Sequence, residues 1–412
     1  MPRSRSKPAL VAAVAVLGAC GAPAPSTSTS ARPAEPAVWQ VRAAGGQTPI
    51  DPGAAPRALL DAESCRECHA EEHREWSGSR HGQAWTNGIF QREYSAQPRA
   101  WCVNCHAPLR TQQEELAAGD SRLADQGVSC AACHVRRGAL VSRRRAASSP
   151  HETIVDESFG SPAMCADCHQ FTFPVMRPRD GVALRMTEHP MQSTVSDFLA
   201  GPFAARATGC LTCHATRHGH GFPGGHDPSM LRRALASSWC RAGDAVVIEV
   251  ANEGAGHRVP TGDIHRHLLA RVWRSSAPES TFEAFFGRRY EPAPGGGKRI
   301  TWDSTLAPGQ RRRFRVPLAS LASLPPAGLA GEAIAGEAGD EAPELSAGEL
   351  REAGAPEPAE DGGDPDEPLN FELTYVYTID EFPRAGRAPG EPVTSRLVAE
   401  RRAFLDLPRC AE

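Results

Sequence analysis

The cysteines and histidines of this chain repeat at a fixed spacing. Thirteen cysteines occur in the sequence, and ten of them lie in five copies of Cys-x-x-Cys-His. The paired cysteines are Cys65 and Cys68, Cys102 and Cys105, Cys130 and Cys133, Cys165 and Cys168, and Cys210 and Cys213. The histidines that follow them are His69, His106, His134, His169 and His214. Each copy therefore offers two thiols and one imidazole within five residues.

This spacing is the attachment signature of c-type haem. The two thiols can each add to one vinyl group of the porphyrin, and the next imidazole then binds the iron from one side. The sequence therefore predicts five covalently bound c-type haems. The ten motif cysteines are the expected attachment sites, and the five motif histidines are the expected proximal iron ligands.

Two other uses of paired cysteines are disfavoured. Repeated Cys-x-x-Cys pairs also build zinc sites, but zinc does not require a histidine directly after every second cysteine. A redox-active dithiol of the thioredoxin type is expected near a βαβ pattern, and no copy has one. Haem iron is therefore favoured over zinc and over a dithiol.

Ten further histidines could supply the sixth iron ligands. They are His73, His81, His151, His189, His218, His220, His226, His257, His265 and His267. Ligation by two histidines leaves no open coordination site and suits electron transfer, whereas a missing sixth ligand permits substrate binding. The number of histidines alone does not separate these outcomes.

The stretch CRECHAEEHREWSGSRHGQA, residues 65–84, resembles the opening of a multihaem cytochrome c superfamily. That superfamily includes the tetrahaem electron carrier of ammonia oxidation, hydroxylamine oxidoreductase and pentahaem nitrite reductase. The shared pattern is Cys-x-x-Cys-His followed by Trp76-x-x-Ser79-x-His81-x-x-Ala84. In that family the last histidine is typically the distal ligand of a different haem, so the resemblance implies this role for His81.

Three more stretches resemble motifs of the same superfamily, which the chain matches in scattered places over about residues 60–236 and again in the C-terminal part. GVSCAACH, residues 127–134, is similar to a pattern that a ligating histidine follows, which implies His151, although Val135 replaces the usual glycine. His-x-Phe-x-Gly-Gly implies His220 as a distal ligand, with His226 next. The fourth, NEGAGHRVPTGD, implies His257.

The N-terminus has the pattern of an export signal. A basic segment and the short apolar run of residues 9–17 precede Leu17-Gly18-Ala19-Cys20, which resembles the bacterial lipobox. Residues 1–19 are therefore expected to be a lipoprotein signal peptide, with Cys20 acylated and residues 20–56 forming a flexible tether. Gly21 implies sorting to the outer membrane, facing the periplasm or the cell surface.

Two cysteines remain after the haem motifs and Cys20, and these are Cys240 and Cys410. Thiols outside the cytoplasm are usually paired or bonded to another group. Because the two residues bracket the C-terminal region, a disulfide between them is predicted. Free buried cysteines are the alternative.

The fold is expected to be multidomain. The motifs begin 37, 28, 35 and 45 residues apart, and about 35 residues per haem are too few for separate protein cores. Residues 57–238 should therefore form a mostly helical or irregular pentahaem domain packed around its porphyrins.

Short alternating runs follow at 244–251, 267–275, 281–290, 298–306, 312–318, 371–379 and 395–407. They predict a sandwich-like β-domain over residues 239–412. The acidic segment at about 325–368 is expected to be a disordered insertion.

The favoured function is electron transfer by an exported pentahaem lipoprotein that relays electrons between periplasmic or outer-membrane redox partners. An outer-membrane conduit or a quinol-linked periplasmic donor would fit, with the lipid anchor as the membrane contact. The alternative is a multihaem oxidoreductase that acts on a small nitrogen or sulfur compound at an open haem. No catalytic residue is assigned, so enzymatic activity stays an open question.

Neither enzyme of the resembled superfamily is matched at its active site. The nitrite reductases use a Cys-x-x-Cys-Lys haem, which this chain lacks. Hydroxylamine oxidoreductase uses a tyrosine crosslink, and none of the four tyrosines here lies in a matching motif. Nucleic acid is not an expected partner, because the arginine runs at 143–145 and 311–313 carry no interleaved aromatic residues.

Overall fold

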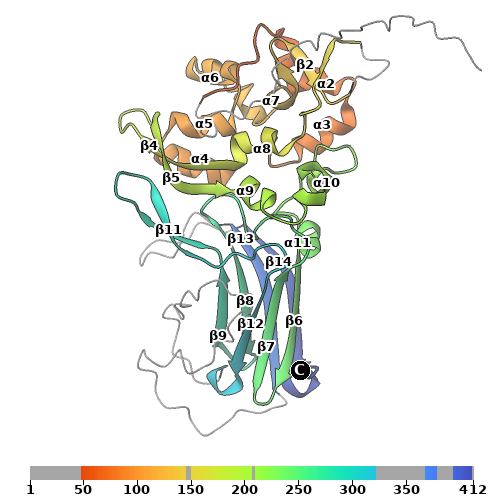
Figure 1. Ribbon diagram of the computed structural model, residues 1–412, viewed down its shortest axis with the longest axis vertical. Coiled ribbons are helices and arrows are strands. Elements are labelled where there is room, and N and C mark those ends of the chain that lie inside the picture. Colours follow the sequence, from red (N-terminus) through yellow and green to blue (C-terminus); the bar gives the residue numbers. More distant parts are fainter. Residues whose placement is uncertain (1–47, 145–149, 207–208, 322–366, 378–392, 411–412) are drawn as a thin grey trace, which may run out of the picture. The chain divides into compact units, whose positions relative to one another are not determined.

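The computed structural model describes residues 48–144, 150–206, 209–321, 367–377 and 393–410 (Figure 1). These residues belong to one compact unit that spans residues 37–412. The predicted signal peptide, Cys20, most of the predicted tether and nearly all of the acidic insertion lie outside the described residues. Among the helices that are described, none has the length and apolar content needed to cross a membrane.

Short helices dominate the N-terminal part. They are α1 (Arg57–Leu60), α2 (Ala62–Arg66), α3 (Ala70–Ser77), α4 (Gly88–Ala96), α5 (Ala100–His106), α6 (Arg110–Ala117), α7 (Cys130–His134), α8 (Pro162–His169), α9 (Thr194–Leu199), α10 (Cys210–His214) and α11 (Pro228–Ala234). The longest has nine residues, so side-chain packing and not helix propensity must stabilise them. Their hydrophobic clusters are small, and the larger of two gathers Leu60, Leu109 and Leu123 with Val135.

The same part also contains strands that the sequence pattern did not predict. One three-stranded sheet has the order β1 (Val135–Arg136), β2 (Ala139–Ser142) and β3 (Thr153–Val155). A two-stranded hairpin joins β4 (Gln170–Met176) to β5 (Ala183–Ser193). The hairpin contains Pro174 and Pro190, and its register shifts beside them. Proline is tolerated at bulges and edges of a sheet, but it obscures a strand in the sequence.

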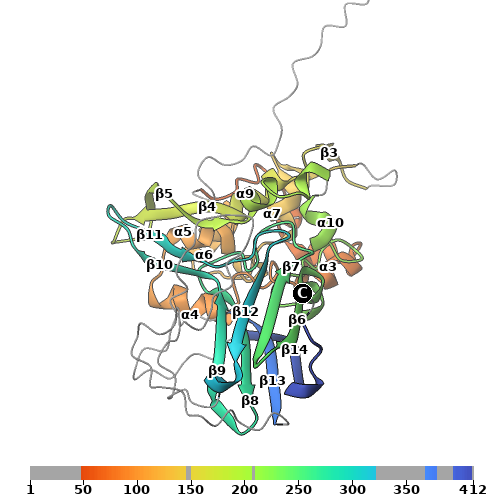
Figure 2. The same ribbon diagram turned by 60° about the horizontal axis from the view of Figure 1, so that its bottom comes forward.

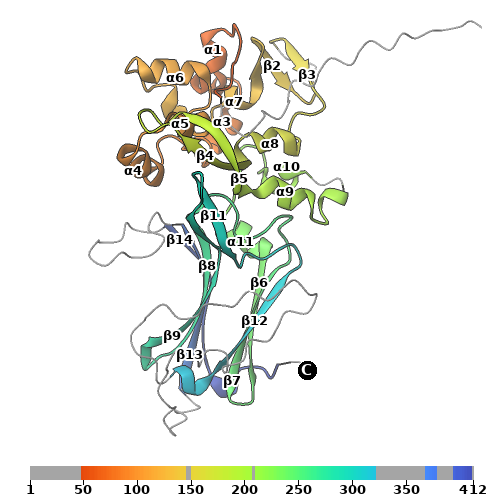
Figure 3. The same cartoon turned by 60° about the vertical axis from the view of Figure 1, so that its left-hand side comes forward.

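Two antiparallel sheets build the C-terminal part (Figures 2 and 3). The first has the order β12 (Arg311–Pro317), β7 (Ala245–Asn252) and β6 (Leu235–Ala242). The second has the order β14 (Val393–Ala403), β13 (Pro368–Tyr377), β8 (Arg266–Arg274) and β9 (Ala277–Phe286). The prediction of helices followed by β-structure is therefore confirmed.

One hydrophobic cluster joins the two sheets. Val246, Ile248 and Val250 alternate along β7 and are fully buried, as expected when every second residue of a strand faces the core. They share the cluster with Leu268 of β8 and Phe371 of β13. Side chains from both sheets thus fill a common interior, which is the arrangement of a β-sandwich.

The strand limits differ from the sequence pattern in two places. Strand β6 begins at Leu235, before the boundary expected at residue 239, and it pairs with β7 along its whole length. The predicted strand 281–290 is divided between β9 and β10 (Arg288–Pro292), which forms a separate hairpin with β11 (Lys298–Asp303). Gly287 lies at the division, where a side chain would meet Phe285 and His267.

A disulfide connects Cys240 of β6 to Cys410 near the C-terminus, with a Cα–Cα distance of 5.0 Å. The backbone beside it is also paired, since Cys410 donates an N–H hydrogen bond to the Arg241 carbonyl at 3.0 Å. The bridge therefore fastens the last described residues to the first strand of the sandwich.

Candidate haem-binding centre

The Cys-x-x-Cys-His motifs lie on single helical turns. Helices α7 and α10 consist of one motif each, and α5 and α8 end at their motif histidines. Residues three apart on a helix lie on the same face, so both thiols of a motif project to one side. The first motif differs because α2 ends at Arg66 and His69 precedes α3. None of the ten motif cysteines forms a disulfide.

Cysteines of different motifs contact one another. A hydrogen bond from Cys130 lowers the pKa of the Cys65 thiol to about 7, and one from Cys165 does the same for Cys210. Burial raises the pKa of Cys133 to about 11, to which its electrostatic interaction with Cys168 adds. The attachment sites of motifs 1, 3, 4 and 5 are therefore neighbours in that order.

Three motif histidines face a second imidazole. The ring centroids of His169 and His81 are 6.2 Å apart, those of His134 and His220 are 6.1 Å apart, and those of His214 and His257 are 6.2 Å apart. A metal–imidazole bond is about 2 Å long, so two imidazoles on opposite sides of one metal place their centroids about 6 Å apart. The three pairs thus have the separation that bis-histidine iron requires.

Backbone carbonyls orient several of these imidazoles. The Nδ1 atom of His214 lies 2.7 Å from the Pro223 carbonyl, and that of His134 lies 3.1 Å from the Val141 carbonyl. On the distal side, Nδ1 of His257 is 2.8 Å from the Arg258 carbonyl. A carbonyl can only accept, so Nδ1 carries the proton and Nε2 keeps its lone pair for a metal.

Burial favours the neutral form of His81, His134 and His169. It lowers the pKa of His81 to about 3, with smaller contributions from nearby histidines, and it lowers the pKa values of His134 and His169 to about 4. A histidine must be unprotonated to bind iron. Charge state and tautomer therefore both fit haem ligation.

His106 has different surroundings. Its ring stacks on Phe90 with centroids 3.6 Å apart and planes 6° apart, and its Nδ1 lies 2.7 Å from the Ala84 carbonyl. Among the described residues, the ring that stacks on His106 is that of Phe90 and not an imidazole. Phe90 belongs to a cluster with Trp85 that surrounds this side of His106.

The other two implied distal histidines have different surroundings. His151 is exposed and lies just before β3. His226 packs against Tyr377 and Tyr375, with ring centroids 5.5 and 6.3 Å away, and its buried Nδ1 has no hydrogen-bond partner. Burial lowers the pKa of His226 to about 4, and the neighbouring arginines lower it further.

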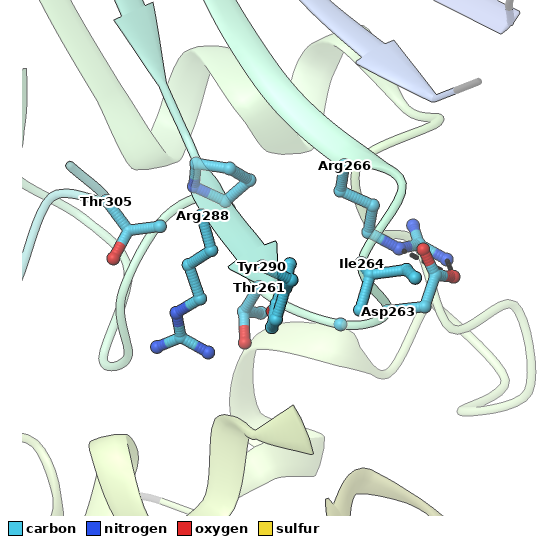
Figure 4. A pocket seen from close by; sticks show the side chains of 9 residues that line it. Thr261, Asp263, Ile264, Arg266, Arg288, Tyr290 and Thr305 are labelled. Atoms are coloured by element: carbon cyan, nitrogen blue, oxygen red, sulfur yellow. Dashed lines mark hydrogen bonds and ion pairs between the residues drawn. The ribbon is translucent and has the colours of Figure 1, made fainter. Parts of the chain in front are cut away.

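Asp263 and Arg266 belong to a charged cluster that the sequence pattern did not indicate (Figure 4). Arg266 donates to the Asp263 carboxylate at 3.1 Å and to the Tyr375 hydroxyl at 3.1 Å, and its guanidinium lies 4.6 Å from the centre of the Tyr377 ring. Burial lowers the pKa of His169, and the charge of Arg266 lowers it further. Burial also lowers the pKa of His106, but there the charge of Asp263 opposes the lowering. Asp263 already lay in the quoted stretch NEGAGHRVPTGD.

Arg288 and Tyr290 line one pocket together with Thr261, Asp263 and Arg266 (Figure 4). Arg288 donates to Asp303 at 2.9 Å and to the Ser193 hydroxyl at 3.0 Å. Thr261 also shares a hydrogen bond of 2.7 Å with Thr194 at the start of α9. The loop that carries His257 is therefore fixed to the helical part by polar contacts. In the described chain no group of three or more His, Cys, Asp or Glu side chains gathers as a metal site.

Comparison with known proteins adds two similarities. A family model described as cytochrome c554 and c-prime matches residues 64–135, which contain the first three motifs. The crystal structure of a penta-heme cytochrome c552 from Thermochromatium tepidum is similar to 84% of this chain and 99% of its own, with a TM-score of 0.52 and 16% identity. None of the curated proteins matches. At that identity the structural likeness concerns the fold, and together with the family match and the repeated motifs it supports a multihaem c-type cytochrome.

Proposed function

We propose that the protein carries electrons through five covalently bound c-type haems. Haem iron supplies a one-electron couple between its ferric and ferrous states. The observation that carries the proposal is the set of three imidazole pairs whose centroids are 6.1 to 6.2 Å apart. Two protein ligands on an iron close it to substrates and favour electron transfer.

The contacts between motifs support a continuous path. Cys65 touches Cys130, Cys133 interacts with Cys168, and Cys165 touches Cys210. Haems attached at these thiols would be neighbours along motifs 1, 3, 4 and 5, an order that favours electron exchange between them.

The decisive measurement is the spectrum of the holoprotein with its haem stoichiometry. The proposal expects five haems per chain and low-spin ferric signals in electron paramagnetic resonance for at least the haems at His134, His169 and His214. A chain with fewer than five haems, or with high-spin signals from those three, contradicts it.

Export and membrane attachment through Cys20 are part of the proposal and rest on the sequence pattern. The partners are proposed to be redox proteins of the periplasm or outer membrane, such as a conduit or a quinol-linked donor. Each oxidised bis-histidine haem with ionised propionates adds about one negative charge to the formal −4 of the chain, which favours a basic partner. A Cys20→Ser variant should be exported but released from the membrane fraction, and its retention there would contradict the anchor.

One observation favours a second candidate function at motif 2. Among the described residues His106 stacks on Phe90 and not on an imidazole, which suits an iron with an open position. Such a haem could react with a small nitrogen or sulfur compound. A high-spin signal of one haem per chain that disappears on addition of nitrite or hydroxylamine would support this function. Five low-spin haems whose signals stay unchanged on addition of either compound would contradict this function.

A further inference from the structure

Glu75 on α3 connects two parts of the chain that are far apart in sequence. Its carboxylate accepts hydrogen bonds from the backbone N–H groups of His218, at 3.2 Å, and His220, at 3.1 Å. It also accepts one from the hydroxyl of Thr216. Three donors of one loop, about 140 residues later in the chain, thus converge on a single side chain.

The loop is built around this carboxylate. Thr216 accepts a hydrogen bond from the Gly221 N–H at 3.1 Å, and the Nδ1 atom of His220 lies 2.6 Å from the His218 carbonyl. Gly219 adopts a φ of +82°, a left-handed conformation that residues with a side chain rarely adopt. The turn therefore directs the N–H groups of His218 and His220 at one anion.

The same loop holds a candidate distal ligand. The ring of His220 lies 6.1 Å from that of His134, at the separation of two ligands of one iron. Its Nδ1 is directed to a carbonyl within the loop, so Nε2 is the nitrogen left for coordination. Because the backbone N–H of His220 donates a hydrogen bond to Glu75, the position and orientation of the His220 imidazole depend on Glu75.

We propose that Glu75 is the positioning residue for His220, holding it as the sixth ligand of the haem at Cys130, Cys133 and His134. This rests on the proposed haem function. Hydrogen bonds to a carboxylate are stronger than those between neutral groups, so the anion fixes the loop better than an amide of the same shape. Glu75 follows the first haem motif, and His220 lies in the loop after the fifth. Because His220 faces the histidine of the third motif, Glu75 would link ligation at the third motif to the loop of the fifth.

The test compares holoproteins carrying Glu75→Gln, His220→Ala or both, with Glu72→Gln on the same helix as the matched control. The amide can accept from only some of the three donors and turns its own N–H groups toward the rest. Glu75→Gln should therefore convert one haem per chain from low spin to high spin, and added imidazole should restore the low-spin signal. Glu72→Gln should leave all signals unchanged.

The double variant separates positioning from general destabilisation. If Glu75 acts through His220, the double variant has the same single high-spin haem as His220→Ala. A Glu75→Gln protein with an unchanged spectrum, while His220→Ala becomes high spin, overturns the proposal and leaves the haem function intact. A His220→Ala protein without any spectral change overturns the ligand assignment itself.

A milder variant decides the matter if Glu75→Gln fails to fold. Thr216→Val removes one of the three donors and keeps the carboxylate. The midpoint potential or ligand-field band of one haem should then shift while haem content stays at five. An unshifted set of potentials in this variant overturns the positioning role.

Discussion

At the scale of single residues, a carbonyl oxygen decides which nitrogen of a histidine is available to iron. The Pro223 and Val141 carbonyls face Nδ1 of two motif histidines, and the Arg258 carbonyl faces Nδ1 of His257. Such outer contacts fix the tautomer before any metal is bound. The positions of these carbonyls depend on loops and strand ends that have no recognisable sequence pattern, and only the histidines themselves could be found from the sequence.

Replacement of His257 by alanine should open one iron. The loss of the imidazole opposite His214 leaves that haem with a single protein ligand, so one haem per chain should become high spin while the others keep their signals. Electron paramagnetic resonance of the oxidised protein measures this. His189→Ala on β5 serves as the control, and an equal effect of that variant would argue against the pairing.

Asp263 and Arg266 should shift reduction potentials in opposite directions. A nearby positive charge disfavours the ferric state, so Arg266→Gln should lower the potential of the haem at His169. Asp263→Asn should raise that of the haem at His106. Each shift should be on the order of tens of millivolts, as expected for one partly screened charge. Spectroelectrochemical titration decides this, and shifts of the same sign would contradict the argument.

At the scale of secondary structure, the sequence predicted the sandwich better than the haem-binding part. The alternation of apolar and polar residues is strong where one face of a strand packs against a large core, as in β7 with Val246, Ile248 and Val250. It fails in the β4–β5 hairpin, where Pro174 and Pro190 interrupt the pattern. The β4–β5 hairpin also makes contacts outside itself. One is between Phe173 and Tyr290 of β10, whose ring centroids are 5.7 Å apart. A local pattern cannot contain such contacts.

His267 should make the sandwich sensitive to acid. Burial on β8, where it stacks on Phe285, and then the charge of Arg271 lower its pKa from 6.5 to about 4. Between these two pH values the unfolded chain binds a proton that the folded chain does not bind. The free energy of unfolding therefore falls as the pH drops from about 6.5 to about 4. His267→Gln should flatten this part of the curve, as followed by denaturant unfolding. An unchanged pH dependence would show that His267 is not responsible.

At the scale of the whole molecule, apolar packing is unequally distributed. The sandwich has one large cluster from both sheets, while the helical part has small clusters around residues such as Leu109 and Trp85. The proposed haems would account for this difference, because porphyrin surfaces can supply the missing apolar area. The five attachment motifs were evident from spacing, but which histidine faces which motif is a property of the folded chain.

The stability of the helical part should therefore depend on haem, whereas that of the sandwich should not. A chain whose ten motif cysteines are changed to serine should lose protease resistance between residues 57 and 234, because its small clusters bury little apolar area. The described strands from β6 to β14 keep their own core and the disulfide, and should survive as a resistant fragment. Limited proteolysis with mass spectrometry identifies the fragment. Resistance of the helical segment equal to that of the holoprotein would refute the expectation.

The contacts between motif cysteines also matter while the protein is being made. Cys65 lies against Cys130 and Cys165 against Cys210, so a folded chain without haem presents thiols of different motifs to one another. In an oxidising compartment, thiols in contact are open to disulfide formation and exchange. A single wrong disulfide would then block two of the proposed haem sites together, so maturation of an exported chain would require reduction between motifs as well as within them.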